Sequence, residues 1–111
     1  MQILEKYAND IKRLCLEHKV RRLYAFGSIL TDRFNGESDI DLIVDFEPID
    51  VIQYADNYFD LKFSLQDVLK RQIDLLEDKT IKNPYFMQAV NQQRKVIFPG
   101  FSFLPIPLMS K

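Results

Sequence analysis

The sequence comprises 111 residues, and its 15 Lys and Arg side chains against 16 Asp and Glu give a formal net charge of -1. Its length and its 47% content of hydrophobic residues are those of one domain with a buried core. Proteins that hold long nucleic acids by their phosphates usually carry a clear basic excess, so this balance disfavours a nucleic-acid partner. The single cysteine, Cys15, excludes an internal disulfide and a zinc site built on cysteines.

The sequence also indicates where the protein works. Residues 1–14 are charged throughout and contain no apolar segment of the kind found in signal peptides. No run of about 18 apolar residues occurs, so we expect no transmembrane helix and no membrane partner. Together with the lone cysteine, these features predict a soluble protein of a reducing compartment, the cytoplasm.

The N-terminal segment is expected to be helical. Apolar side chains recur every three or four residues over 2–18, which predicts an amphipathic helix with one stripe facing the core. Cys15 and His18 lie on that stripe or at its end. We interpret them as a small core residue and a helix-end imidazole, rather than as a reactive thiol and a catalytic base.

Two strands and a short helical segment are expected next. Residues 20–26 are rich in strand-forming side chains and end at a glycine. Residues 28–34 fit one or two helical turns, and the Asn-Gly-Glu-Ser cluster at 35–38 indicates a turn. Residues 39–46 then predict a second strand, which Pro48 closes.

The remaining elements complete an α/β fold. A long helix is expected after the second strand, with a possible break at 60–63, followed by a strand at 72–77, a helix at 83–94 and a strand at 95–98. This order predicts a small sheet of about four strands flanked by helices. The expected core positions of the long helix are Ile52, Ala55, Phe59, Phe63, Val68 and Leu69.

The last residues differ in composition from the rest. We expect a domain over 1–98 and a separate apolar, proline-rich tail over 99–111 that cannot form a regular helix. Two interpretations of the tail stay open. It could pack on its own domain, or it could lie across a second copy and make the protein a homo-oligomer.

Three aspartates in apolar strands carry the chemical signal. Side chains alternate along a strand, so Asp39 and Asp41 point to the same face, with Cα atoms about 6.5–7 Å apart. Asp74 has the same apolar surroundings in the third strand. If that strand lies beside the second, three carboxylates meet, and they repel one another unless cations lie between them. Hard oxygen ligands suit Mg²⁺ or Mn²⁺.

A phosphate-binding corner is expected beside these carboxylates. Gly27 and Ser28 follow the first strand, where glycine allows a ligand to approach the backbone and the turn N–H groups and serine hydroxyl can hold phosphate oxygens. A phosphate site beside a two-metal carboxylate site is typical of phosphoryl or nucleotidyl transfer.

Two competing motifs fail on these residues, and ion pairing accounts for only part of them. An EF-hand loop opening at Asp39 requires glycine where Val44 stands, and a Walker A loop opening at Gly27 lacks its second glycine and its lysine. Ion pairs with Arg21, Arg22 or Arg71 could explain one of the aspartates, but not three beside a Gly-Ser corner.

The motif resembles that of a known family. Gly27-Ser28, ten residues, the Asp39–Asp41 segment and a later Asp74 are similar to the minimal nucleotidyltransferase (MNT) branch of the polymerase-β-like nucleotidyltransferase superfamily. The resemblance covers about residues 1–98 and is closest to MntA-like antitoxins of HEPN/MNT toxin–antitoxin pairs. It implies the fold of that superfamily, a small mixed sheet flanked by helices.

The resemblance also implies roles for the site residues. Asp39, Asp41 and Asp74 would be catalytic and would bind two Mg²⁺ ions, with Mn²⁺ as an alternative, and Asp74 would help to activate the attacking hydroxyl. Gly27 and Ser28 would bind the phosphates of the nucleotide.

The sequence departs from the family pattern in this corner. Many members carry Arg directly after Gly-Ser and Gly a few residues later, where this chain has Ile29 and Asp32. One phosphate contact is therefore in question, and Arg33 could supply it as a nucleotide-binding residue.

For the function, the resemblance implies transfer of AMP from ATP to a hydroxyl, a tyrosine of a HEPN-domain toxin, by a protein acting as its antitoxin. Two alternatives stay open. The chain could be a binding module that masks the toxin without catalysis. It could also nucleotidylate a small molecule of the aminoglycoside type, with a helical partner subunit.

Overall fold

The computed structural model describes residues 2–100 and contains one mixed sheet with the strand order β3-β2-β1-β4. The strands are β1 (Val20–Phe26), β2 (Ile40–Phe46), β3 (Ile73–Glu77) and β4 (Lys95–Phe98). Strand β1 is antiparallel to both β2 and β4, whereas β2 and β3 are parallel. The four-stranded mixed sheet predicted from the sequence is confirmed.

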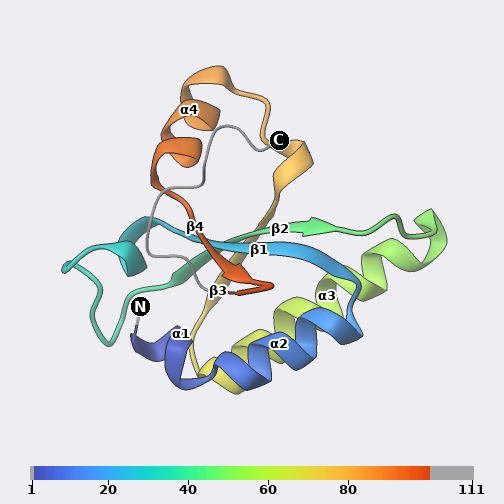
Figure 1. The fold of residues 1–111 in the computed structure, drawn as a ribbon, viewed down its shortest axis with the longest axis horizontal. Helices are drawn as coiled ribbons and strands as arrows, with labels where there is room; N and C mark the ends of the chain where they lie inside the picture. The colour runs from blue at the N-terminus through green and yellow to red at the C-terminus, as the bar shows by residue number, and fades with distance from the viewer. Residues whose placement is uncertain (1, 101–111) are drawn as a thin grey trace.

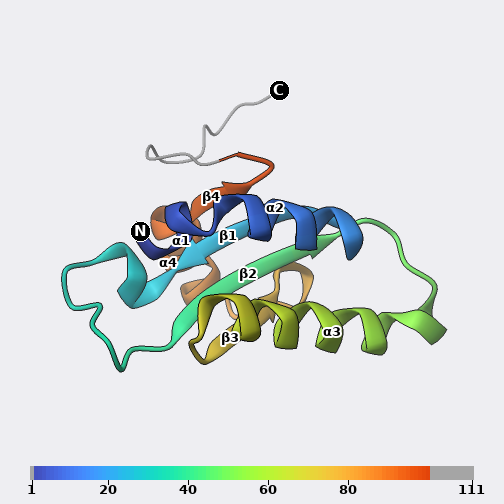
Figure 2. The same ribbon diagram turned by 90° about the horizontal axis from the view of Figure 1, so that it is seen from below.

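Helices cover both faces of this sheet. Helices α1, α2 and α3 lie on one face and α4 on the other (Figures 1 and 2). None of the helices in residues 2–100 is long and apolar enough to cross a membrane. The helical elements are α1 (Gln2–Lys6), α2 (Ala8–Glu17), α3 (Val51–Leu69) and α4 (Pro84–Gln93), with short 3₁₀ turns at η1 (Gly27–Leu30) and η2 (Asp78–Thr80).

Strand β2 is buried on both faces, and its side chains point alternately into the core on each side of the sheet. Ile40, Leu42 and Val44 are fully buried in the main core, which the sheet forms with α1, α2 and α3. Ile43 points the other way, into a smaller core with residues that include Val90 of α4. Because side chains alternate, Asp41 lies on the α4 face.

Helix α3 is the connection that makes β3 parallel to β2, since a parallel pair needs a long crossover. The Asp50 side chain accepts a hydrogen bond from the Ile52 N–H at the start of α3, as expected of a helix cap. Lys70 ends the helix in the left-handed conformation, with φ of 56°. The chain thus turns sharply and enters β3 beside the start of β2.

The core face predicted for α3 is partly wrong. Leu69 is buried and Val68 is half-buried as predicted, but four of the six predicted positions are exposed: Ile52, Ala55, Phe59 and Phe63. The helix is also continuous, without a break at 60–63. Apolar and aromatic side chains occur on more than one face of α3, so spacing alone could not show which face packs on the sheet. The side chains that fill the core are Leu61, Leu65 and Leu69, with Tyr54 and Tyr58 partly buried beside them.

The N-terminal prediction is closer to the structure. The expected single helix over 2–18 is two helices that meet at Tyr7, but its apolar stripe is correct, since Leu4, Ile11 and Leu14 are buried. All but the first two residues of the predicted tail, 99–111, lie outside the described residues, so its separate character and its role in a homo-oligomer stay predictions.

We expect the main core to carry the stability of the fold. Replacing the fully buried Leu65 of α3 by Ala should lower the free energy of unfolding by about 2–5 kcal/mol, because it removes apolar contacts and leaves a cavity. Leu16→Ala on α2 is the matched control, since Leu16 is 64% exposed, and should change it by less than about 0.5 kcal/mol. Urea denaturation measures both, and equal effects would contradict the assignment of the core.

Candidate functional site

The pairing of β2 with β3 brings two of the predicted aspartates together. Asp41 and Asp74 are direct partners in the parallel register, so their side chains lie on the same face of adjacent strands. Burial, followed by the negative charges of Asp74 and Asp39, raises the pKa of the Asp41 carboxyl. The other two carboxylates therefore both act on Asp41, as the sequence predicts if the third strand lies beside the second.

Asp39 lies just outside the sheet. Strand β2 begins at Ile40, so Asp39 directly precedes it and is exposed, as Asp74 is. The Ile40 N–H donates to the Gln72 carbonyl oxygen at 3.0 Å, which ties this point of the chain to the segment before β3. The aspartates thus gather where β2 and β3 begin.

Apolar groups from the opposite side account for the burial of Asp41. Phe26, the last residue of β1, is its partner across the antiparallel pair. The Phe26 ring packs edge-on against Phe86 of α4, with ring centroids 5.8 Å apart. This side of the site is therefore poorer in water than the side of Asp74.

Gly27 brings the predicted phosphate corner against the same carboxylate. Its φ is 81°, a conformation that side chains rarely adopt, and a Cβ atom added there would lie 2.5 Å from Asp41 Oδ2. Only glycine satisfies both constraints. The two halves of the sequence motif, although separated by ten residues, are therefore in contact.

The residues after Gly27 form a compact turn. Ser28 is half-buried, and its carbonyl oxygen accepts from both the N–H and the hydroxyl of Thr31, each at 2.9 Å. Arg33 is exposed, and none of the ion pairs within residues 2–100 includes its guanidinium. Its side chain is thus available to a ligand at this end of the sheet.

The departure at Ile29 has a structural cause. Ile29 is only 2% exposed and belongs to the main core. The side chain at position 29 packs into the main core, so Ile29 adds apolar contacts beneath the turn that begins at Gly27 and Ser28. Any phosphate contact from a cation must come from elsewhere, and Arg33 is close in sequence and exposed.

The arrangement fits a divalent cation, although it is not a finished metal site. Within residues 2–100, no three His, Cys, Asp or Glu side chains already form a cluster that could hold a metal ion. However, the exposed Asp39 and Asp74 have room to rotate toward Asp41, and hard carboxylate oxygens are the ligands of Mg²⁺ and Mn²⁺. A cation would also relieve the repulsion from Asp74 and Asp39 that, after burial, raises the pKa of Asp41. These three residues are the ones that would hold it.

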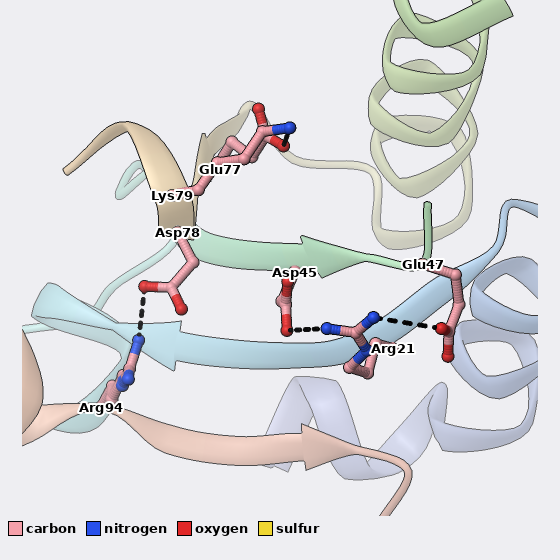
Figure 3. A network of polar contacts seen from close by, with 7 residues as sticks. All are labelled: Arg21, Asp45, Glu47, Glu77, Asp78, Lys79 and Arg94. Carbon is pink, nitrogen blue, oxygen red and sulfur yellow. Dashed lines mark hydrogen bonds and ion pairs between the residues drawn. The ribbon is translucent and has the colours of Figure 1, made fainter. Parts of the chain in front are cut away.

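Ion pairing does not account for the three aspartates. Arg21 pairs instead with Asp45 at 3.6 Å and with Glu47 at 3.3 Å (Figure 3). No ion pair in the part of the chain that the structure describes involves Asp39, Asp41 or Asp74. The ion pairs of the described residues therefore do not explain why the three aspartates lie together.

The sequence reasoning missed how Asp74 is held. On the open edge of β3, the Gln66 Oε1 accepts from the Ile73 N–H at 3.3 Å, and the Tyr58 hydroxyl donates to the Leu75 carbonyl oxygen. Both side chains come from α3 and bond the residues on either side of Asp74. The positions of Tyr58 and Gln66 along α3 were the sequence signal for these contacts. The prediction for this helix used only its apolar positions.

Cys15 and His18 take no part in the site, as interpreted from the sequence. Burial raises the pKa of the Cys15 thiol to about 12, so it is not a reactive thiolate near neutral pH. His18 follows α2, and its Nδ1 lies 2.8 Å from the Leu14 carbonyl oxygen.

Comparison with known proteins adds a family to this geometry. Residues 9–99 match the family model described as polymerase beta, nucleotidyltransferase. A protein of Methanocaldococcus jannaschii with the provisional name protein adenylyltransferase is 32% identical over 91 residues, which cover 81% of this chain and 86% of the relative. Another of the same organism and provisional name is 29% identical over 92 residues, which cover 82% and 87%.

Solved structures agree with the sequence relatives. A toxin–antitoxin crystal structure with AMP-PNP superposes with a TM-score of 0.63 at 26% identity, over 82% of this chain and 72% of that chain. A complex of a tri-AMPylated Shewanella oneidensis HEPN toxin with its MNT antitoxin gives 0.59 at 25% identity, over 88% and 72%. A structure with the provisional name minimal nucleotidyltransferase, at 24% identity and a TM-score of 0.68 over 84% of this chain and 91% of that chain, shows the same fold.

The contact between Gly27 and Asp41 gives a sharp prediction. Gly27→Ala should lower the free energy of unfolding by about 1–3 kcal/mol and displace the Asp41 carboxylate, because φ and space both oppose a side chain. Gly36→Ala is the matched control, since nothing lies within 4 Å of a Cβ at Gly36. Denaturation and the chemical shift of the Asp41 carboxyl measure the two effects, and a Gly27→Ala variant like the Gly36→Ala variant would refute the contact.

The raised pKa of Asp41 predicts a pH-dependent stability of the metal-free protein. Because the folded protein holds the Asp41 proton more tightly than the unfolded chain does, stability from this group is full below its unfolded pKa of about 3.9 and is lost as pH rises through the folded pKa. Asp41→Asn removes the titrating carboxyl and therefore also removes this loss of stability at higher pH. Its melting temperature relative to wild type should therefore rise between acidic and neutral pH, and a constant difference would contradict the shift.

Proposed function

Because the chain belongs to the polymerase-β nucleotidyltransferase family, we propose that it is a Mg²⁺-dependent enzyme that transfers AMP from ATP to a hydroxyl of a partner protein, a tyrosine of a HEPN toxin, and so acts as an antitoxin. The observation that carries the proposal is the register of Asp41 against Asp74, with the Gly27 backbone against the Asp41 carboxylate. That geometry gathers the aspartates and the Gly27–Ser28 turn at one end of the sheet, which supports their proposed roles in binding metal and phosphate.

The site residues would divide the chemistry among themselves. Asp39, Asp41 and Asp74 would hold the divalent cations, which supply charge neutralisation on the triphosphate and lower the pKa of a bound hydroxyl. Gly27 and Ser28 would position the phosphates by backbone N–H groups and the serine hydroxyl. The acceptor oxygen then attacks the α-phosphorus, the bond to pyrophosphate breaks, and Asp74 helps to remove the hydroxyl proton.

The acceptor follows from the relatives. The M. jannaschii relatives carry the provisional name protein adenylyltransferase, and the S. oneidensis complex contains a tri-AMPylated HEPN toxin beside its MNT antitoxin. The exposed Asp74 leaves one side of the site open to a protein segment. These similarities support a HEPN toxin as the acceptor protein, and we propose a tyrosine hydroxyl on it because the family resemblance implies that residue type.

A second candidate is an antitoxin that acts by contact alone. Two observations favour it: no ready metal cluster occurs within residues 2–100, and the buried Ile29 fills the position where the family pattern that the sequence resembles often has Arg. In that case the aspartates would be dispensable for neutralisation.

Transfer of labelled AMP tests the proposal. We expect incubation with ATP labelled at the α-phosphate, Mg²⁺ and the HEPN toxin proposed as its partner to label a tyrosine of that toxin. Asp41→Asn should lower the rate by at least about 10²-fold, since it removes a charge at the reacting phosphates. Asp45→Asn is the matched control on the same strand and face, because Asp45 pairs with Arg21, and it should stay near the wild-type rate.

The outcomes separate the candidates. Absence of label from protein and small molecules, or an Asp41→Asn variant that still transfers AMP at the wild-type rate, would defeat the enzymatic proposal. Full neutralisation of the toxin by Asp41→Asn without transfer would establish the contact-only antitoxin. Label on an aminoglycoside-type small molecule alone would move the acceptor away from protein.

A further inference from the structure

We propose that Arg71 is a positioning residue that fixes Asp39 relative to Asp74, and so sets how closely these carboxylates approach a shared cation. The inference rests on the proposed function. Arg71 lies in the turn between α3 and β3, three residues before Asp74. The sequence suggests Arg71 only as an ion-pair partner of one aspartate, but its contacts join the two segments that carry the aspartates.

The guanidinium of Arg71 binds the loop before β2. Its Nη2 donates to the Ser38 carbonyl oxygen at 2.6 Å and to the Asn35 carbonyl oxygen. Ser38 directly precedes Asp39. The Nη2 atom of Arg71, which lies in the segment before β3, therefore binds the backbone next to Asp39. Hydrogen bonds from a charged donor are shorter and stronger than those between neutral groups.

A ring beneath the guanidinium holds it in place. The Arg71 Cζ lies 4.5 Å from the centroid of the Phe34 ring, and Phe34 itself packs on the main core. Stacking on an aromatic face suits the planar guanidinium and restricts its rotation. Arg71 is thus anchored to the core before it reaches the loop.

The loop that Arg71 grips is bonded within itself. The Asn35 side chain accepts from the Glu37 N–H at 2.8 Å, and the Ser38 hydroxyl accepts from the Asn35 N–H at 3.1 Å. The Ser38 N–H also donates to the Asn35 carbonyl oxygen at 3.2 Å. Because the two carbonyl groups belong to one bonded turn, holding them fixes the turn as a unit.

Backbone pairing fixes only the other side of Asp39. The Ile40 N–H bonds the Gln72 carbonyl oxygen, after which the β2–β3 ladder begins. Asp39 therefore lies between a backbone bond at Ile40 and the Arg71 bonds at Ser38. Without Arg71, its N-terminal side would be held only by the internal bonds of the turn.

The test uses metal alone, so that it does not depend on nucleotide binding. In Arg71→Ala, we expect Mn²⁺ affinity, measured by electron paramagnetic resonance, to fall about 10–100-fold, as when a residue that orients a metal ligand is lost. Amide hydrogen exchange should become faster at Glu37, Ser38 and Asp39. In transfer assays, the Mg²⁺ concentration for half-maximal rate should rise while the KM for ATP stays near the wild-type value.

Two further variants make the test specific. Arg71→Lys should recover part of the Mn²⁺ affinity, because an ammonium group can still donate to a carbonyl oxygen but does not stack as a planar fork. Arg13→Ala is the control, since Arg13 is 52% exposed and makes only surface ion pairs with Asp10 and Glu17, at 3.5 and 3.6 Å. It should match the wild type in every measurement.

Wild-type Mn²⁺ affinity and wild-type amide hydrogen exchange in Arg71→Ala would overturn the inference. A rise in the KM for ATP alone would also overturn it, because Arg71 would then be a phosphate ligand. If Arg71→Ala does not fold, Arg71→Lys decides by the same criteria. A wild type that binds Mn²⁺ but transfers no AMP would defeat the proposed function and leave this inference standing. A wild type that binds no Mn²⁺ would defeat both.

Discussion

The parallel pairing of β2 with β3 is the constraint on which the rest of the site depends. It sets Asp41 directly beside Asp74, and a shift of one residue would turn one of the two carboxylates to the opposite face of the sheet. Helix α3 stabilises this pairing in two ways. It makes the crossover between the two strands, and its Tyr58 and Gln66 side chains bond the open edge of β3. Asp41 and Asp74 are thus held in place by uncharged side chains and backbone pairing, whereas Asp39 is held by backbone bonds and by Arg71.

This register works against the stability of the metal-free protein. Asp41 lies against the Gly27 backbone and near two further carboxylates, and burial, followed by these two negative charges, raises the pKa of its carboxyl. The same strand offsets that cost on its other face, where Ile40 and Leu42 are fully buried. A buried apolar strand that holds like charges close together is the arrangement expected of a cation site, because the bound ion relieves the repulsion between those charges.

How much of this could be predicted from the sequence depended on the type of pattern. The alternation in 39–46 and 72–77 predicted the strands and the common face of Asp39 and Asp41, and the motif spacing predicted that Gly27 belongs to the same site. The buried face of α3 could not be predicted, because Phe59 and Phe63 are as apolar as the leucines and only packing distinguishes them. Side chains that bond distant backbone, such as Arg71 at Ser38, leave no periodic signal.

The central claim is that Asp41 and Asp74 act together on one cation site beside the Gly27 corner. The most direct measurement is electron paramagnetic resonance of Mn²⁺ bound in the presence of an ATP analogue that cannot release pyrophosphate. We predict Mn²⁺ bound to the wild type, with a signal that depends on the nucleotide, and loss of that signal in both Asp41→Asn and Asp74→Asn. Mn²⁺ bound equally well by the wild type and the two variants would contradict the claim.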